Sequence, residues 1–316
     1  MYSLLEPLNG LDTWPSKPVI DTHLHFWNEK LIPLFFKWSS HYFSDNLSVV
    51  SMMEPELIKK LPADYRERII IAQFLTTKNI GLYNSKELIK QIDQAYADGV
   101  EVFKLWLAPR FLDGNKLPGP FNLLDERLDS VFSRLEDLKY TISAHISDPD
   151  LWYLFHYQDK AKYGSKLEHI QRFLTITEKY HKIKFFATHF ACWPENLKEL
   201  DSILEKHPRL YINTGSTRWM IRELSKQRNE TVKFISKYQD RIIFGSDLHV
   251  TKEPIDPLYF STRYWSHRAF WETNIETKLP FNDSDAPFGI RFKGLDLPKQ
   301  ILEKMYYKNF MHLFKS

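Results

Sequence analysis

The sequence is short of several features whose absence narrows what the protein can be. It contains a single cysteine, Cys192, which excludes an internal disulfide and favours a reducing compartment, so we expect a cytoplasmic protein. Its formal net charge is only +3, which gives no reason to expect binding to nucleic acid or to an anionic membrane. It has no apolar run of membrane-spanning length, and residues 1–16 lack the apolar core of a signal peptide.

Glycine is also scarce. Only ten glycines occur in 316 residues, and no Gly-x-Gly-x-x-Gly motif follows the first predicted strand, which weakens a dinucleotide-binding fold. Aromatic residues, in contrast, make up 15% of the chain. We therefore expect a small-molecule substrate as the binding partner. Assembly into a homo-oligomer is an alternative that the sequence leaves open.

Short apolar segments alternate with amphipathic ones along most of the chain. We predict buried strands at residues 19–25, 48–53, 68–74, 100–106, 140–145, 184–189, 209–213 and 241–247. Helices are predicted at residues 54–61, 86–97, 123–138, 166–180, 194–206, 219–238 and 298–314. Eight strand–helix repeats predict an α/β fold closed into a (β/α)8 TIM barrel, a single domain over residues 1–316 with its core at about 19–314. An open, doubly wound sheet is the alternative.

Two segments fall outside this repeat. Residues 26–46 are rich in aromatic side chains but lack a clean helical period, so we predict a loop or short helices there. Residues 249–297 form a long insertion after the eighth strand.

Two histidines end the first predicted strand. Because successive side chains of a strand point to opposite faces, His23 and His25 point the same way. Two imidazoles so placed can begin a chelate for a zinc-like ion. The alternative is a pair of solvated histidines where the strand leaves the sheet.

Other polar residues also fall at strand ends, where a barrel carries its chemistry. The fourth strand carries Lys104, and the fifth, sixth and eighth end in His145, His189 and Asp247. Singly, each has an ordinary structural explanation, such as a hydrogen-bonded histidine or a capping aspartate. Together they predict one metal site, formed by His23, His25, Lys104, His145, His189 and Asp247.

These residues resemble the amidohydrolase superfamily, specifically its single-domain amidohydrolase-related (amidohydrolase-2) branch. The resemblance rests on Ile-Asp-Thr-His-Leu-His at residues 20–25, Ala-Thr-His at 187–189, Arg-Ile-Ile-Phe-Gly-Ser-Asp at 241–247 and the closing segment 302–309. It runs from about residue 19 to residue 314. The combination is specific, although His-x-His alone is not.

The resemblance implies a distorted, metal-dependent-hydrolase TIM barrel with one or two divalent ions, Zn²⁺ in the first place and Mn²⁺ or another ion as alternatives. It makes His23, His25 and His145 metal ligands and Asp247 both ligand and general base. His189 would bind a second metal or act as acid/base beside a single one. Lys104 would be a carboxylated lysine bridging two metals, as in hydantoinase-like relatives, although the chain lacks their flanking β-sandwich domain.

The function implied is metal-dependent hydrolysis of an amide, lactone or ester bond in a small organic substrate by an activated water. A metal-dependent decarboxylase of a small carboxylic acid would use nearly the same residues. A barrel that binds metal or ligand without turnover is the third hypothesis. Substrate contacts are expected from Arg110 and Arg218, which follow strands four and seven, and from Arg263 and Arg268 in an aromatic segment, residues 259–271, predicted to form a lid.

Overall fold

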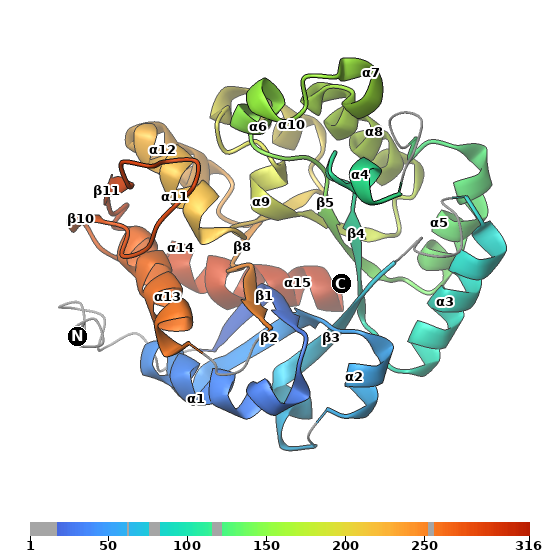
Figure 1. The fold of residues 1–316 in the computed structure, drawn as a ribbon, viewed down its shortest axis with the longest axis horizontal. Helices are drawn as coiled ribbons and strands as arrows, with labels where there is room; N and C mark the ends of the chain where they lie inside the picture. Colours follow the sequence, from blue (N-terminus) through green and yellow to red (C-terminus); the bar gives the residue numbers. More distant parts are fainter. Residues whose placement is uncertain (1–17, 62, 76–82, 116–121, 252–255) are drawn as a thin grey trace. The chain divides into compact units, whose positions relative to one another are not determined.

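The computed structural model describes residues 18–61, 63–75, 83–115, 122–251 and 256–316 (Figure 1). The contacts divide the chain into two compact units. The first comprises Met1–Ile70 and Asn213–Ser316, and the second comprises Ile71–Ile212. The single domain over residues 1–316 stays a prediction. No helix in the described part of the chain is long and apolar enough to cross a membrane.

The first unit is organised on a short parallel sheet. Its strands are β1 (Val19–Phe26), β2 (Leu47–Met52), β8 (Ile242–Ile243) and β9 (Leu248–Val250). The central strand, β1, pairs in parallel with β2 on one side and β9 on the other. All eight residues of β1 are buried, which explains why it reads as an apolar run interrupted only by its functional residues. In Figure 1, β1 and β2 lie side by side.

The eighth strand is shorter than predicted. We expected a strand at residues 241–247, but β8 covers only Ile242–Ile243, and the chain resumes pairing at β9. The reason is local, because Asp247 has a left-handed φ of 62°, which is incompatible with a strand. The residue predicted at the strand end is thus at a sharp bend.

Helices cover this sheet. They are α1 (Ile32–Phe43), α2 (Pro55–Lys59), α11 (Thr217–Lys226), α12 (Arg228–Lys237), α13 (Pro257–Glu272), α14 (Lys299–Glu303) and α15 (Asn309–Lys315), with 3₁₀ turns at Glu29–Leu31, Ser44–Asn46 and Ala63–Arg68. A π-helical turn at Lys304–Lys308 joins α14 to α15. The hairpin β10 (Glu276–Lys278) and β11 (Arg291–Lys293) completes the unit.

The second unit repeats strand and helix as predicted. Its strands β3 (Ile69–Phe74), β4 (Val102–Trp106), β5 (Thr141–His145), β6 (Lys184–Ala187) and β7 (Tyr211–Asn213) pair in parallel in chain order. Between them run α3 (Ser85–Ala97), α5 (Asp129–Asp137) after a 3₁₀ turn at Glu126–Leu128, α8 (Lys166–Lys179), α10 (Leu197–Lys206) and the short α4 (Phe111–Asn115), α6 (Asp150–Phe155), α7 (Lys160–Tyr163) and α9 (Thr188–Ala191). The N-cap of α3 is Asn84, whose side chain accepts from the Glu87 backbone N–H.

Of the two alternatives predicted for residues 26–46, a loop or short helices, the helical one holds in part: the twelve-residue α1 lies there between two 3₁₀ turns. It packs against α13 and also contacts β2. Apolar side chains therefore occupy more than one of its faces, which erases the helical period in the sequence. The rings of Phe35 and Phe260 pack edge to face at 5.6 Å, and Phe43 meets Tyr264 in the same way at 4.9 Å.

The aromatic segment at residues 259–271 is accordingly a packed helix rather than a loose flap. The Arg268 guanidinium joins α13 to α1, and a substrate contact by Arg268 stays a prediction. Its guanidinium pairs with Glu272 at 2.8 Å and donates to the Tyr42 carbonyl at 2.7 Å. Both charged side chains are almost completely buried, at 5% and 4% exposure.

We predict that Glu272→Gln lowers the free energy of unfolding by about 3 kcal/mol or more, because it leaves the Arg268 charge buried and unpaired. Urea denaturation curves of wild type and variant give the change in the free energy of unfolding from the shift of their midpoints. Glu56→Gln is the matched control, since Glu56 forms a highly exposed pair with Lys59 at 3.1 Å and its loss should cost less than about 0.5 kcal/mol. Equal effects of the two substitutions would contradict a structural role for the Arg268 pair.

Candidate metal centre

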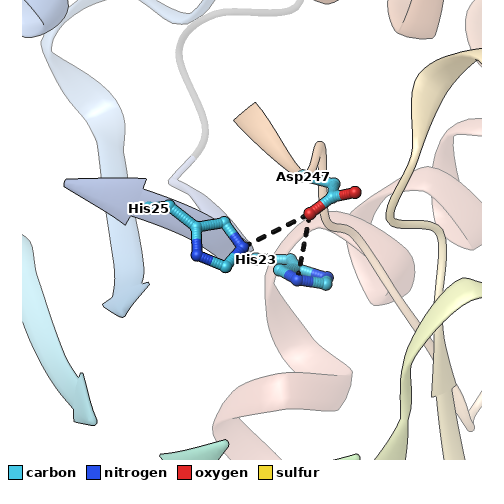
Figure 2. Close-up of side chains that lie close together, drawn as sticks. All are labelled: His23, His25 and Asp247. Atoms are coloured by element: carbon cyan, nitrogen blue, oxygen red, sulfur yellow. Dashed lines mark ion pairs between the residues drawn. The ribbon is translucent and has the colours of Figure 1, made fainter. Parts of the chain in front are cut away.

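The first unit brings together three of the predicted ligands. The Asp247 Oδ1 atom lies 3.2 Å from His23 Nε2 and 3.4 Å from His25 Nε2. Each residue offers one ligand atom, and these atoms all lie within 4.8 Å of one another. Figure 2 shows both imidazoles turned towards the carboxylate. Two imidazole nitrogens and one carboxylate oxygen form a donor set that fits a divalent transition metal and leaves coordination positions open.

The two histidines reach one point because β1 is irregular. Its register with β2 shifts between Asp21 and Leu24, so β1 holds one residue more than its partner over this stretch. Such a bulge re-aims side chains and is common beside active sites. His23 and His25 are both buried, at 1% and 5% exposure.

A backbone hydrogen bond to β1 holds Asp247 in place. Its N–H donates to the His23 carbonyl at 2.8 Å, so the bend at Asp247 is tied to the strand that carries the histidines. The left-handed conformation is costly for a residue with a Cβ, by about 1 kcal/mol or more. The surrounding contacts therefore hold a conformation that aims the carboxylate at the imidazoles.

Asp21 lies beneath this bend and is completely buried. One of its carboxylate oxygens accepts from the backbone N–H groups of His23 at 3.1 Å and Ser246 at 2.9 Å. The other accepts from the Ser246 hydroxyl and, at 2.9 Å, from the Tyr264 hydroxyl. Burial raises the pKa of Asp21 to about 6, although these hydrogen bonds oppose the rise. One carboxylate thus connects β1, the Asp247 bend and α13.

Gly245 permits the close approach of these segments. A Cβ at this position would lie 2.8 Å from the Asn213 amide nitrogen and 2.9 Å from the His23 Cβ, closer than such atoms pack. The lack of room for a Cβ beside the proposed ligand His23 therefore explains the glycine of the Gly-Ser-Asp motif.

His249 belongs to the same cluster and was missed from the sequence. Its ring stacks on that of His25 with centroids 4.1 Å apart, and its Nε2 lies 3.7 Å from Asp247 Oδ1. Its side chain is 46% exposed, so it lies on the solvent side of the cluster. The signal in the sequence was the spacing Asp-x-His, which mirrors His23-x-His25.

The second unit holds another group of predicted residues. The rings of His145 and His189 meet edge to face with centroids 4.5 Å apart. His145, the last residue of β5, also has its Nε2 3.3 Å from Asp148 Oδ1. Burial alone would raise the pKa of Asp148, but the adjacent His145, the Tyr157 hydroxyl and the charge of Arg110 hold that pKa below its usual value.

His189 does not end a strand as predicted, because β6 stops at Ala187. It begins four consecutive residues with left-handed φ angles of 58°, 52°, 50° and 60°, ending at Cys192. Such a run of non-glycine residues stores backbone strain, and strain of this kind clusters at functional sites.

Lys104 is buried in β4, and its ammonium donates to the Thr188 hydroxyl at 3.4 Å. Thr188 in turn donates to the Ala144 carbonyl at 3.2 Å. This links β4, β5 and the turn before His189. A metal-bridging or carboxylated Lys104 stays a prediction, as do the ligand roles of His145 and His189.

Three of the four predicted substrate arginines are free of carboxylate partners. Within the described residues, no carboxylate oxygen lies within 4.0 Å of a guanidinium nitrogen of Arg110, Arg218 or Arg263, in contrast to Arg268. Arg110 is exposed and lies over the Trp152 ring at 4.6 Å. Arg263 lies over the rings of Tyr259 and Phe281, at 3.9 and 4.4 Å.

The charge of Arg218 reaches Arg263. Burial lowers the pKa of Arg263, and the charge of the exposed Arg218 lowers it further, while Tyr259 and Asp256 act in the opposite sense. Burial raises the pKa of Tyr259, and the charges of Asp247 and the two arginines also reach it. The Tyr259 hydroxyl accepts from the His249 backbone N–H at 3.2 Å. This part of α13 therefore lies beside the His23–His25–Asp247 cluster, although closure of a lid stays a prediction.

No family model matches the chain. Among curated proteins, the dihydroorotase of Helicobacter pylori (strain HPAG1) is 24% identical over 197 residues, 61% of this chain and 52% of that protein. The chain thus spans about half the length of the curated relatives it matches.

Solved structures match a larger part of this chain. A TIM-barrel protein from Bordetella bronchiseptica matches with a TM-score of 0.57 at 13% identity, over 94% of this chain and 98% of that one. A putative 2-pyrone-4,6-dicarboxylic acid hydrolase from Pseudomonas putida matches with 0.55 at 10% identity, over 94% and 97%. A 5-carboxyvanillate decarboxylase from Novosphingobium aromaticivorans, solved with manganese, matches with 0.53 at 12% identity, over 96% and 97%.

These likenesses confirm the predicted α/β TIM-barrel fold. They agree with the resemblance to the amidohydrolase superfamily, because two further structures of this fold are named amidohydrolases and the sequence relatives are dihydroorotases. The neighbours include both hydrolases and decarboxylases.

We predict that His23→Ala and Asp247→Asn each lower the bound metal at least tenfold, because each removes one of three donors, while the circular dichroism spectrum stays that of the folded protein. Plasma mass spectrometry on protein purified without chelator measures the metal. His181→Ala is the control, since this exposed histidine lies outside the cluster. Full metal in both site variants would refute the centre.

A buried histidine behind the Asp247 bend predicts a pH effect. The His267 ring accepts from the Trp271 indole N–H at Nδ1, 3.2 Å away, and its Nε2 lies 2.9 Å from the Thr217 hydroxyl. Burial lowers the pKa of His267 to about 3, below its ordinary value of about 6.5. Its neutral form therefore stabilises the fold fully above about pH 6.5, and this contribution is lost as the pH falls through the window towards 3.

In chelator-treated protein, wild type should lose about 1.4 kcal/mol of unfolding free energy per pH unit within this window beyond the loss in His267→Gln. Urea unfolding at several pH values between about 4 and 7 gives both slopes. Parallel slopes would show that His267 does not titrate between the folded and unfolded states.

Proposed function

We propose that the protein is a metal-dependent hydrolase whose centre is built on His23, His25 and Asp247. The observation that carries this proposal is the approach of two buried imidazole nitrogens to one carboxylate oxygen, at 3.2 and 3.4 Å. The fold shared with amidohydrolases and with a putative dicarboxylic acid hydrolase supports it. Zn²⁺ is the ion we expect first, given two imidazoles and one carboxylate, with Mn²⁺ as the alternative.

A divalent ion held by these residues would supply Lewis acidity for a substrate carbonyl and lower the pKa of a water. Asp247 takes the proton from the attacking water and returns it to the leaving group. Its side chain is 24% exposed, so its carboxylate is accessible to both. His23 and His25 hold their nitrogens in place because β1 is buried along its whole length. His189 is proposed as a second acid/base or metal ligand.

The substrate of this reaction carries an anionic group. Arg218 and Arg263 lie close enough for one charge to lower the pKa of the other, and neither has a carboxylate within 4.0 Å among the described residues. Two such guanidinium groups can bind a carboxylate, which would relieve their mutual repulsion. The aromatic faces of Tyr259 and Phe281 under Arg263 supply apolar surface for the rest of a small organic molecule. Arg110, over Trp152, is a further proposed contact.

A metal-dependent decarboxylase is the second candidate, and the same arginines favour it, because its substrate must be a carboxylic acid. In that reaction the arginines and centre hold the substrate while Asp247 or His189 protonates the carbon that loses carbon dioxide. A decarboxylase among the structural neighbours supports this candidate. The cytoplasmic location and any oligomer stay predictions.

Isotope labelling separates the candidates. The zinc- or manganese-loaded chain is incubated with panels of carboxylated lactones, cyclic amides and aromatic acids in H₂¹⁸O and, separately, in D₂O. Hydrolysis places ¹⁸O in the product carboxyl group, whereas decarboxylation releases carbon dioxide and places deuterium on carbon. Metal binding with neither label across the panels would support the non-catalytic barrel.

We predict that Arg263→Ala raises the KM for a carboxylated substrate about ten- to a hundredfold, the loss expected for one hydrogen bond to a charged group. Folding should be unaffected, because Arg263 forms no ion pair in the described structure. Arg291→Ala is the control, an exposed arginine on β11. An unchanged KM would remove Arg263 from the substrate site.

A further inference from the structure

A hollow of about 260 Å³ lies in the second unit, where α8 leads into β6 and α10 leads into β7. Residues at the ends of both helices, at the start of β6 and in the turn before β7 line it. Because β5, β6 and β7 are parallel, this is the N-terminal end of their sheet, whereas His145 ends β5 and His189 follows β6. Catalytic sites of TIM barrels lie at the C-terminal ends of the strands, so a ligand in this hollow is not placed for turnover.

Part of the lining is apolar. It includes the buried side chains of Ile183, Phe185 and Leu210. The Phe185 ring packs edge to face on Phe173, with centroids 5.6 Å apart, which restricts its rotation. A concave surface of this kind suits the apolar body of a ligand.

The charged part of the lining is mainly basic. Lys206 and Arg209 are exposed at the hollow, and among the described residues no carboxylate oxygen lies within 4.0 Å of either cationic group. The acidic residue of the lining, Glu178, has its Oε1 3.5 Å from His207 Nδ1. Burial lowers the pKa of His207, Glu178 opposes this, and the charge of Lys206 lowers it further. With His207 neutral, the lining carries one net positive charge, which suits a ligand with a single negative charge.

Backbone hydrogen bonds hold both turns that form the hollow. The Ile183 N–H donates to the Tyr180 carbonyl at 3.2 Å, just after α8. The His207 N–H donates to the Ile203 carbonyl at 2.9 Å, and the Leu210 N–H donates to the His207 carbonyl at 3.0 Å. The lining is therefore preformed, which lowers the entropic cost of binding a small ligand.

We propose that this hollow binds a small organic acid with a single carboxylate and an apolar body. Arg209 and Lys206 hold the carboxylate, and the three apolar side chains contact the body. A molecule of liquid water takes about 30 Å³, so a hollow of about 260 Å³ holds on the order of nine non-hydrogen atoms. The site shares no residue with the proposed metal centre and does not rest on the proposed function.

The test follows the full chain labelled with ¹³C at the δ1 methyl groups of isoleucine, because Ile183 reports from within the hollow. Ile183→Val identifies the Ile183 signal by its loss. Benzoate, cyclohexanecarboxylate and hexanoate, three acids of suitable size, are titrated at neutral pH and constant ionic strength. We expect a saturable shift of the Ile183 signal with a dissociation constant on the order of 1 mM, an affinity within reach of a ligand of this size.

Two further probes separate the parts of the ligand. Benzamide has the shape of benzoate without its charge, and inorganic phosphate has charge without an apolar body, so each should bind at least about tenfold more weakly.

Arg209→Gln should weaken the binding of benzoate about tenfold, because it removes the guanidinium that pairs with the carboxylate. Lys198→Gln is the matched control, since Lys198 is an exposed cation on α10 outside the lining, and it should leave the binding unchanged. Thermal unfolding of each variant verifies the fold.

Each part of the proposal has an outcome that overturns it. The absence of a saturable Ile183 shift with all three acids overturns the site. Equal binding of benzamide overturns recognition of the charge, and equal binding of phosphate overturns the organic-acid class. Unchanged benzoate affinity in folded Arg209→Gln overturns the placement of the carboxylate. None of these measurements depends on a metal, so the proposed hydrolase function can fail without affecting them.

Discussion

The first unit depends on one buried carboxylate, that of Asp21. It accepts hydrogen bonds from the chain at His23, from the backbone and side chain of Ser246, and from Tyr264 on α13. These donors come from segments more than two hundred residues apart in sequence, so the carboxylate holds together the strand with the two histidines and the bend with Asp247. Without it, the left-handed Asp247 and the tight approach at Gly245 would lack their main support. A metal site needs its ligands held before the ion arrives, and Asp21 provides that.

Most strands could be predicted because buried parallel strands leave short apolar runs in the sequence, as at Ile69–Phe74 and Thr141–His145. The failures share a physical cause. The helices α1 and α13 pack on more than one side, so their apolar residues lose the helical period that identifies a surface helix. The ends of β6 and β8 were misjudged because left-handed residues stop them, and His189 and Asp247 carry no glycine-like signal of that conformation.

The candidate centre was predictable to the extent that its residues lie at strand ends. His23, His25 and Asp247 meet as expected, since strand polarity places such residues at one edge of the sheet. The residues that support them were not predictable, because their roles depend on contacts distant in sequence or on the local path of a turn. Arg268 also illustrates what the sequence could not show. In the sequence it resembles the other three predicted substrate arginines, and only the structure reveals its ion pair with the buried Glu272.

In each unit, the buried charged side chains find their hydrogen-bond partners within that unit. In the first, Asp21 is satisfied by backbone and hydroxyl donors, which leaves His23 and His25 facing Asp247. In the second, Asp148 accepts from the Tyr157 hydroxyl and lies beside His145, and Lys104 donates to Thr188. The contacts described give Asp21 and Asp148 no shared partner, so substitutions at the two carboxylates should act additively on stability.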